Sequence, residues 1–276
     1  DVMACRQTGF AMLAEGNVQE VMDLSAVAHL SAIKGRVPFI NFFDGFRTSH
    51  EVQKVAVWDY DDLAEMCDMD AVREFRAHAL NPEHPSMRGS HENGDIFFQH
   101  REACNSYYDA LPAVVEDYMH QVNAKLGTSY ELFNYYGAED ADRVIVAMGS
   151  FCDVAEEVID YLNAHGEKVG LVKVRLYRPF VTDKFVAALP KTVKKIAVLD
   201  RTKEPGAVGE PLYMDVINAL AIEGVSGIKV VGGRYGLGSK DTPPASVFAV
   251  FTELEKEDPR REFTLGIVDD VTGLSL

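Results

Sequence analysis

The chain has 276 residues, of which 47% are hydrophobic and 25% are charged, so it has room for one large globular domain or two smaller ones. Its formal net charge of −16 argues against nucleic acids and anionic membrane surfaces as partners, because both attract basic proteins. No signal peptide is visible and no apolar run is long enough to cross a bilayer, so we expect a cytoplasmic protein.

The first predicted elements are a helix and a buried strand. Asn17 and Glu20 have the spacing of a helix N-cap and its capping-box partner, and apolar residues then recur at helical spacing. Lys34 and Gly35 supply the basic last turn and the glycine that commonly end a helix. The large apolar residues at 37–43 follow directly and predict one buried strand.

A polar turn and a series of helices follow this strand. Thr48 and Glu51 have capping-box spacing, so we expect a short helix to begin there. The interval 81–94 is dense in proline, glycine and polar residues, which favours a loop. Pro112 is expected to break or kink the last helical stretch. The predicted helices lie at residues 61–66, 70–80 and 96–126.

The second half of the chain alternates strands and helices regularly. Such alternation predicts an α/β fold with a mostly parallel sheet that is covered on both faces. Residues 127–142 resemble a connection, so we divide the chain into two domains, residues 1–130 and 131–276. The strands are expected at 143–148, 169–177, 195–199 and 228–231, and the helices at 153–165, 182–189, 211–223 and 243–256.

The polar residues after the predicted strand 37–43 are the best candidates for a binding site. In an open α/β sheet, the carboxyl ends of the strands form one wall of a ligand crevice. Arg47 could pair with a carboxylate through two hydrogen bonds, and His50 could move a proton near neutral pH. The alternative is a structural helix start, in which Arg47 pairs with Glu51 and Thr48 acts as the cap.

Two loops of the second domain carry further candidates. Arg201 and Lys203 lie on a loop rich in proline and glycine at 201–211, which suits a domain or subunit contact as well as a ligand. Arg234 lies on the glycine-rich loop 232–240, whose residue order does not match a phosphate-binding P-loop. We therefore expect tight backbone geometry or a close approach to another domain at that loop.

Two other segments give weaker indications. The turn at 148–152 has backbone amides that could face an anion at a helix N-terminus, and the alternative is an ordinary strand–helix turn. The histidines at positions 78, 84 and 91 match no metal-binding spacing, and the four cysteines form no C-x-x-C pair. The sequence therefore predicts no metal site in this chain.

Several segments together are similar to one known family. Residues 42–51, 173–180, 200–206 and 233–240 closely resemble pyruvate:ferredoxin (flavodoxin) oxidoreductases, and residues 5–13 and 269–273 extend the resemblance to both ends. In that family the polypeptide is several times longer. The chain resembles the later part of the first domain, which binds the pyrimidine of thiamine diphosphate, followed by a second domain similar to the C-terminal domain of transketolases. Because it opens at Asp1 without a methionine, we expect an internal fragment.

The resemblance implies an activity that this chain does not complete. The family converts pyruvate and coenzyme A to acetyl-CoA and carbon dioxide and reduces ferredoxin or flavodoxin. Its full-length members hold thiamine diphosphate, magnesium and iron–sulfur clusters, but the residues that hold them belong outside this chain. We therefore expect no cofactor to be held here and the fragment alone to be inactive. The implied partners are the remaining domains of the same polypeptide, in a homodimer.

Three alternatives stay open. The enzyme could act on another 2-oxoacid, because residues that choose the substrate belong to absent parts. The second domain could be a scaffold, a subunit-interface module or a coenzyme A contact, through Arg201, Lys203 and Arg234. A free-standing nucleotide-binding protein would require the loop 232–240 to hold phosphate.

Overall fold

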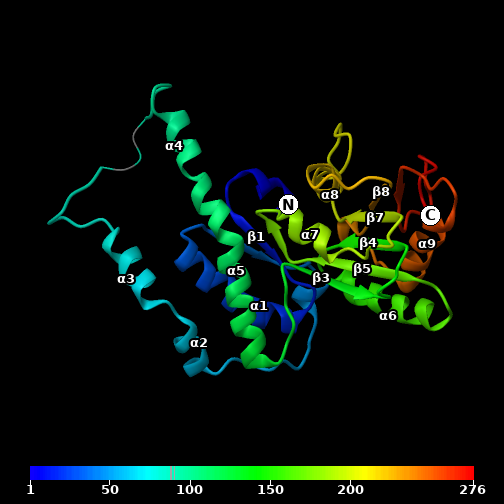
Figure 1. Ribbon diagram of the computed structural model, residues 1–276, viewed down its shortest axis with the longest axis horizontal. Helices are drawn as coiled ribbons and strands as arrows, with labels where there is room; N and C mark the ends of the chain where they lie inside the picture. Colours follow the sequence, from blue (N-terminus) through cyan, green and yellow to red (C-terminus); the bar gives the residue numbers. More distant parts are fainter. Residues whose placement is uncertain (88, 90) are drawn as a thin grey trace.

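The computed structural model describes residues 1–87, 89 and 91–276 and contains two sheets that lie next to each other (Figure 1). One sheet has the order β2-β1-β6 and the other the order β3-β5-β4-β7-β8-β9. The strands are β1 (Ala11–Ala14), β2 (Phe39–Phe42), β3 (Phe133–Gly137), β4 (Arg143–Ala147), β5 (Val169–Val174), β6 (Leu176–Arg178), β7 (Lys195–Asp200), β8 (Lys229–Arg234) and β9 (Glu262–Thr264).

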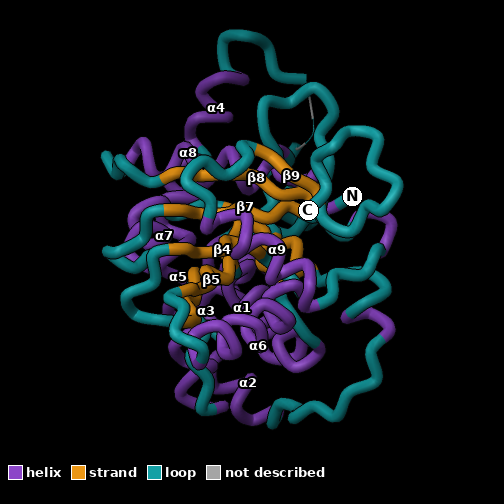
Figure 2. The backbone as a smooth tube through the Cα atoms, turned by 90° about the vertical axis from the view of Figure 1, so that its right-hand side faces the viewer, coloured by secondary structure: helices purple, strands orange, loops and turns teal. Residues whose placement is uncertain are grey.

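Helices cover both faces of the six-stranded sheet, as Figure 2 shows. Helices α6 and α9 pack together on one face, and α7 and α8 pack together on the other. The helices are α1 (Val18–Gly35), α2 (Tyr60–Met66), α3 (Met69–Ala77), α4 (Phe97–Ala103), α5 (Asn105–Leu126), α6 (Phe151–Ala164), α7 (Thr182–Ala188), α8 (Pro211–Ile222) and α9 (Pro244–Glu255). Within the described residues, no helix is both long enough and apolar enough to cross a bilayer.

The predicted α/β class is confirmed, and the six-stranded sheet is mostly parallel. Strands β4, β5, β7, β8 and β9 run parallel to their neighbours, whereas β3 pairs antiparallel with β5. Parallel strands are buried on both faces, which is why β4 and β7 read as continuous apolar runs. The division near residue 130 remains a prediction.

The first helix and strand are confirmed, with one difference at the helix end. The Asn17 side chain accepts a hydrogen bond from the Glu20 amide at 2.9 Å, as an N-cap does. The left-handed residue after the helix is Arg36 (φ 56°), where the sequence favoured Gly35. Gly35 serves a packing role instead, since a Cβ on it would lie 2.5 Å from Leu111 of α5.

The helical region before the second domain differs from the prediction in two places. The short turn Thr48–His50 is a 3-10 helix without a side-chain cap, and the Thr48 hydroxyl instead donates to the Gly16 carbonyl at 3.3 Å. The predicted helix 96–126 is interrupted at Cys104, not at Pro112, which lies inside α5. The expected break at the proline is therefore wrong.

The predicted strand 169–177 is divided at Arg175. Its first part is β5 of the large sheet, and its second part is β6, which pairs antiparallel with β1 of the small sheet. The chain thus passes from one sheet to the other within three residues. Sequence reasoning also missed the short strands β1, β3 and β9.

Candidate functional site

The crevice between the two sheets lies at the carboxyl ends of their parallel strands. Residues directly after β1, β2, β4, β7 and β8 line two adjoining cavities of about 460 Å³ and about 640 Å³. Phe46, Arg201 and Tyr235 line both cavities. This is the arrangement that open α/β sheets use to place ligand-binding groups.

Asp44 connects the two sheets across this crevice. It follows β2, and its Oδ1 lies 2.5 Å from Nη1 of Arg201, which follows β7. Its Oδ2 accepts a hydrogen bond from the Ser150 amide at the start of α6. The carboxylate therefore occupies the helix N-terminus that the sequence offered as an anion site, because it satisfies an amide that would otherwise lack a partner.

Two glycines permit the close approach of these side chains. Gly149 has a φ of 80°, and a Cβ on it would lie 2.6 Å from the Asp44 carboxylate. Gly236 has a φ of 67°, and its carbonyl accepts from Nε of Arg201 at 3.1 Å. The glycine-rich loop after β8 thus provides tight backbone geometry next to the other domain, as the sequence suggested.

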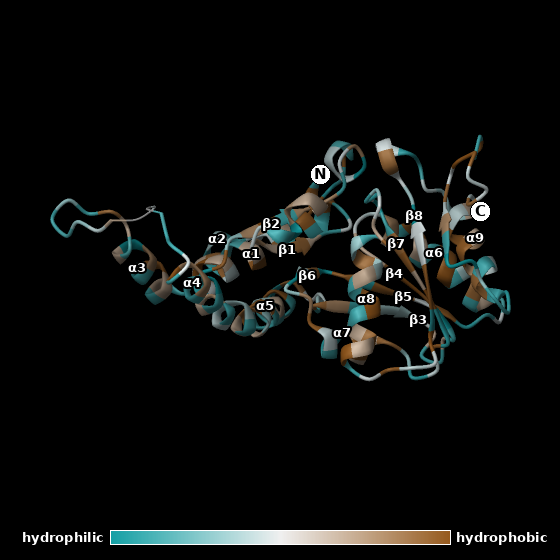
Figure 3. Ribbon diagram, turned by 90° about the horizontal axis from the view of Figure 1, so that it is seen from above, coloured by the Kyte–Doolittle hydropathy of each residue, from teal (hydrophilic) through white to brown (hydrophobic). Residues whose placement is uncertain are grey.

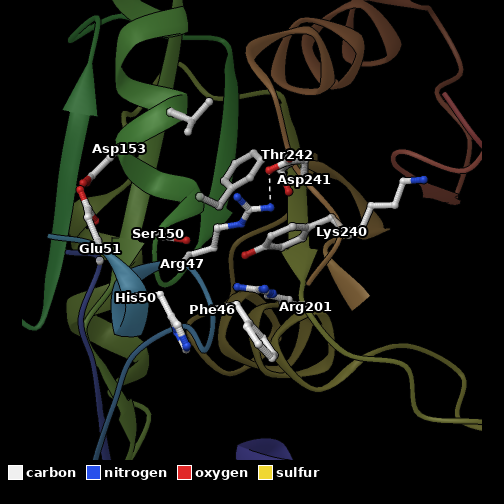
Figure 4. Close-up of a pocket in the computed structure, with 14 residues that line it drawn as sticks. Phe46, Arg47, His50, Glu51, Ser150, Asp153, Arg201, Lys240, Asp241 and Thr242 are labelled. Atoms are coloured by element: carbon white, nitrogen blue, oxygen red, sulfur yellow. Dashed lines mark ion pairs between the residues drawn. The ribbon is translucent and has the colours of Figure 1, made fainter. Parts of the chain in front are cut away.

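Arg47 and His50 lie at the mouth of the smaller cavity, which Figure 4 shows. Arg47 pairs with Asp241 and donates to the Ser239 carbonyl at 3.2 Å, so its expected pairing with Glu51 does not form. The His50 ring stacks on Phe46, with 5.3 Å between the ring centroids. The polar turn after β2 therefore contacts the loop after β8 through Arg47, although the two segments lie far apart in the sequence.

Lys203 and Arg234 both approach one buried carboxylate, that of Glu210, and both also line a cavity of about 290 Å³. Oε1 of Glu210 lies 3.5 Å from Lys203 and 3.6 Å from Arg234, and Arg234 also pairs with Glu262 at 2.8 Å. Glu204 of the same loop pairs with Arg6 at 2.6 Å. The structure thus brings the two predicted loops together through internal ion pairs.

Two buried carboxyl groups in the larger cavity were not predicted. Glu15, directly after β1, is fully buried, and its carboxyl oxygens have no hydrogen-bond partner among the described residues. Burial, together with the nearby Glu20 carboxylate, raises the pKa of Glu15 to about 9. Burial also raises the pKa of Asp200 to about 7, although Asp200 accepts hydrogen bonds from the Leu212 and Tyr213 amides.

A sequence signal existed for Glu15 and for Asp44, which sequence reasoning did not single out as site residues. Glu15 directly follows the apolar run Phe10 to Ala14, and Asp44 lies inside the turn that the sequence already marked. Their partners come from distant parts of the chain, which no local pattern indicates. Within the described ranges, no group of three or more His, Cys, Asp or Glu side chains is placed to hold a metal ion.

Two family models match separate stretches of the chain. Residues 1–120 match the family model described as pyruvate flavodoxin/ferredoxin oxidoreductase, thiamine diP-bdg. Residues 141–246 match the model described as pyruvate:ferredoxin oxidoreductase core domain II. The two matches fall on either side of the connection between α5 and β4.

Curated relatives match the whole chain. It is 62% identical to a pyruvate-flavodoxin oxidoreductase of Klebsiella pneumoniae and 60% identical to a pyruvate:ferredoxin oxidoreductase of Moorella thermoacetica, in each case over all 276 residues. The chain spans 24% of the length of each of these relatives.

A solved structure supports the fold. The 2-oxoglutarate:ferredoxin oxidoreductase of Magnetococcus marinus, with 2-oxoglutarate, coenzyme A and succinyl-CoA bound, has a TM-score of 0.53 and 17% sequence identity. The match covers 89% of this chain and 42% of that one. Taken with the family models and the full-length identities, the resemblance in the sequence is confirmed: the chain belongs to the pyruvate:ferredoxin/flavodoxin oxidoreductase family.

Proposed function

We propose that this chain is part of an enzyme that oxidatively decarboxylates pyruvate. Pyruvate and coenzyme A would give acetyl-CoA and carbon dioxide, and the two electrons released would pass to ferredoxin or flavodoxin. The observation that carries the proposal is the identity of 60% or more, across all 276 residues, to two proteins named for this activity. We place the enzyme in the cytoplasm, as a homodimer whose iron–sulfur clusters lie in other domains.

The described residues fit only part of a thiamine diphosphate site. A diphosphate is commonly held through Mg²⁺ by carboxylate and carbonyl oxygens, and no described group of acidic or histidine side chains is placed to hold a metal. Two arginines of the crevice are already paired, Arg201 with Asp44 and Arg47 with Asp241. When bound, thiamine diphosphate supplies the carbanion chemistry of decarboxylation. Its diphosphate end therefore belongs on another domain.

In this proposal the chain forms one wall of the cofactor pocket and holds it in shape. The turn from Asp44 to His50 is fixed from both sides, by Arg201 after β7 and by Asp241 before α9. Arg47 and His50 are positioning residues that keep this turn in place against the second domain. Fixed turns of this kind reduce the cost of binding, because the pocket is formed before the ligand arrives.

A second candidate function is that of a scaffold or subunit interface, or a coenzyme A contact, for the loops 201–211 and 232–241. The pairing of Lys203 and Arg234 with the buried Glu210 favours the scaffold, because both cations are already neutralised within the chain. Another 2-oxoacid as substrate is the alternative within the family.

The test of the first proposal is Arg47→Ala in the intact enzyme. We expect the variant to lower kcat or raise the KM for pyruvate, because the turn loses its contacts with Asp241 and Ser239. Lys191→Ala is a control, since Lys191 is an exposed cation outside both cavities. Equal kinetics for the two variants would contradict a role for Arg47 in the pocket.

The scaffold candidate makes a different prediction for Lys203→Ala and Arg234→Ala. These variants should change the oligomer mass if the loops form a subunit contact, or the dependence on coenzyme A if they bind it. Neither should change the KM for pyruvate. Separately, the 276-residue chain alone should not reduce a dye in the presence of pyruvate and coenzyme A, and measurable reduction would refute the division of labour proposed here.

A further inference from the structure

Residues 67–104, which we call the arm, contain α3, the connection after it and α4. Figures 1 and 3 show α3 lying away from both sheets. Between Met66 and Leu111, none of the described residues is buried. Apart from Cys67 at its base, which packs against the first hydrophobic cluster, the described residues of the arm lie outside both hydrophobic cores of this chain.

Large hydrophobic side chains are concentrated on the arm. Of the twenty-one that are exposed in the described part of the chain, seven lie on the arm, although the arm holds 38 of 276 residues. Phe75 is 71% exposed and Phe98 is 69% exposed. Single exposed apolar residues are ordinary, but such a concentration marks a contact surface.

The two helices of the arm are short and have little cover within the described part of this chain. α3 has nine residues and α4 has seven, and isolated helices shorter than about 12 residues are marginal in water. α3 is held to α1 by the pairs Lys34–Asp68, at 3.9 Å, and Arg36–Glu74. Exposed pairs of this kind contribute at most about 1 kcal/mol each. α3 is amphipathic, with Met69, Val72 and Phe75 on one side, and this side is only partly covered within the chain, since Met69 is 48% exposed and Phe75 is 71% exposed.

The charge of the arm limits what that surface can be. The arm has seven acidic and four basic residues, and the whole chain has a net charge of −16. A second copy of this segment would bring charges of the same sign, which disfavours it as the cover. The relatives are about four times as long as this chain, so most of their polypeptide lies outside these residues.

We propose that the arm docks against another part of the same longer polypeptide, on an apolar surface with a basic rim that lies outside these 276 residues. The arm then forms a contact between this segment and another domain of the same polypeptide. The inference does not depend on the reaction that the enzyme performs.

The experiment places the photo-crosslinking residue p-benzoylphenylalanine at Phe75 in the intact enzyme. Asp70, on the opposite side of α3, receives the same residue as a matched control. We expect Phe75 to crosslink to peptides outside residues 1–276, at the mass of a single subunit, at least about tenfold more efficiently than Asp70. A product of doubled mass, a crosslink within residues 1–276, or equal efficiency at both positions would each overturn the proposal.

A measurement on the unmodified intact enzyme covers the case in which the substituted proteins fail to fold. Native-state hydrogen exchange should show the amides of α3 protected by the same factor at every protein concentration. Exchange at the rate of an unfolded peptide, or protection that grows with concentration as a second copy would produce, would overturn the proposal.

Discussion

At the scale of single residues, Glu15 is the most unusual group in the chain. A carboxyl that is fully buried without a hydrogen-bond partner is costly when ionised, so it remains protonated at neutral pH. The neighbouring Glu20 carries the negative charge instead. Burial opposes that charge, but the Arg175 guanidinium, together with the Gly16 amide and the Lys173 charge, outweighs burial and lowers the pKa of Glu20.

Glu15→Gln should therefore remove a pH-dependent loss of stability. The pKa of the Glu15 carboxyl is 4.5 in the unfolded chain and about 9 in the folded protein, so the unfolded chain releases this proton first as the pH rises. The contribution of protonated Glu15 to the free energy of unfolding is fully present below pH 4.5. It falls by up to about 1.4 kcal/mol per pH unit until about pH 9. In urea unfolding, the free energy of unfolding of Glu15→Gln relative to that of the wild type should be higher at pH 8 than at pH 5.

The exposed Glu257→Gln is the control for this comparison, and it should follow the wild-type pH dependence. Identical pH dependence for Glu15→Gln and the wild type would show that the Glu15 carboxyl is ionised in the folded protein.

The contacts of Asp44 with Arg201 and the Ser150 amide predict that two aspartates of the same crevice differ in their contribution to stability. Asp44→Asn weakens the contact with Arg201 and the hydrogen bond from the Ser150 amide, both of which lie in a largely shielded position. We expect a loss of about 2 kcal/mol, typical of a hydrogen bond to a charged group. Asp241→Asn removes the other arginine pair, but the Asp241 side chain is 78% exposed, so the loss should stay below about 1 kcal/mol. Equal losses in thermal unfolding would argue against Asp44 as the connection between the sheets.

At the scale of elements, the long periodic segments were predictable and the short ones were not. α1 and α6 have polar starts and regular apolar spacing, and β4 and β7 are unbroken apolar runs, so local pattern was sufficient. β9 has three residues, which is too short for a pattern to be recognised. The break predicted at Pro112 does not occur, because helix α5 continues through this residue and packs against α1.

The division between β5 and β6 is the element that no local rule could place. Arg175 lies between the two strands, is almost fully buried, and pairs with Glu20 of α1 at 2.8 Å. In the sequence, Arg175 lies inside the continuous strand predicted at 169–177. Its true partner is 155 positions away, so only the tertiary structure reveals why the strand ends there.

A double-mutant cycle on this pair tests whether it fixes the passage between the sheets. Arg175→Met leaves the buried Glu20 carboxylate without its cation, and Glu20→Gln leaves the buried Arg175 guanidinium without its anion. Each single change should cost about 3–5 kcal/mol in urea unfolding, and the double variant should cost clearly less than their sum. Simple additivity of the two losses would mean that the residues stabilise the fold independently.

At the scale of the whole molecule, the two sheets share one of the two hydrophobic clusters. That cluster joins Leu13 of β1 and Val27 of α1 to Val146, Val172 and Val198 of the large sheet. The other cluster lies entirely within the second half of the chain. The larger sheet therefore has a core of its own. The smaller sheet receives its strand β6 and part of its hydrophobic core from the second half of the chain.

This asymmetry predicts how the two halves behave when they are expressed separately. Residues 131–276 contain every strand of the six-stranded sheet, so this piece should fold and unfold cooperatively. Residues 1–130 lack β6 and Arg175, which leaves a two-stranded sheet and an unpaired Glu20, so this piece should show little fixed structure. Circular dichroism during heating distinguishes the cases. A cooperative transition in residues 1–130 alone would mean that the first half does not need the strand it receives, whereas structure that appears only after residues 131–276 are added would show that β6 completes it.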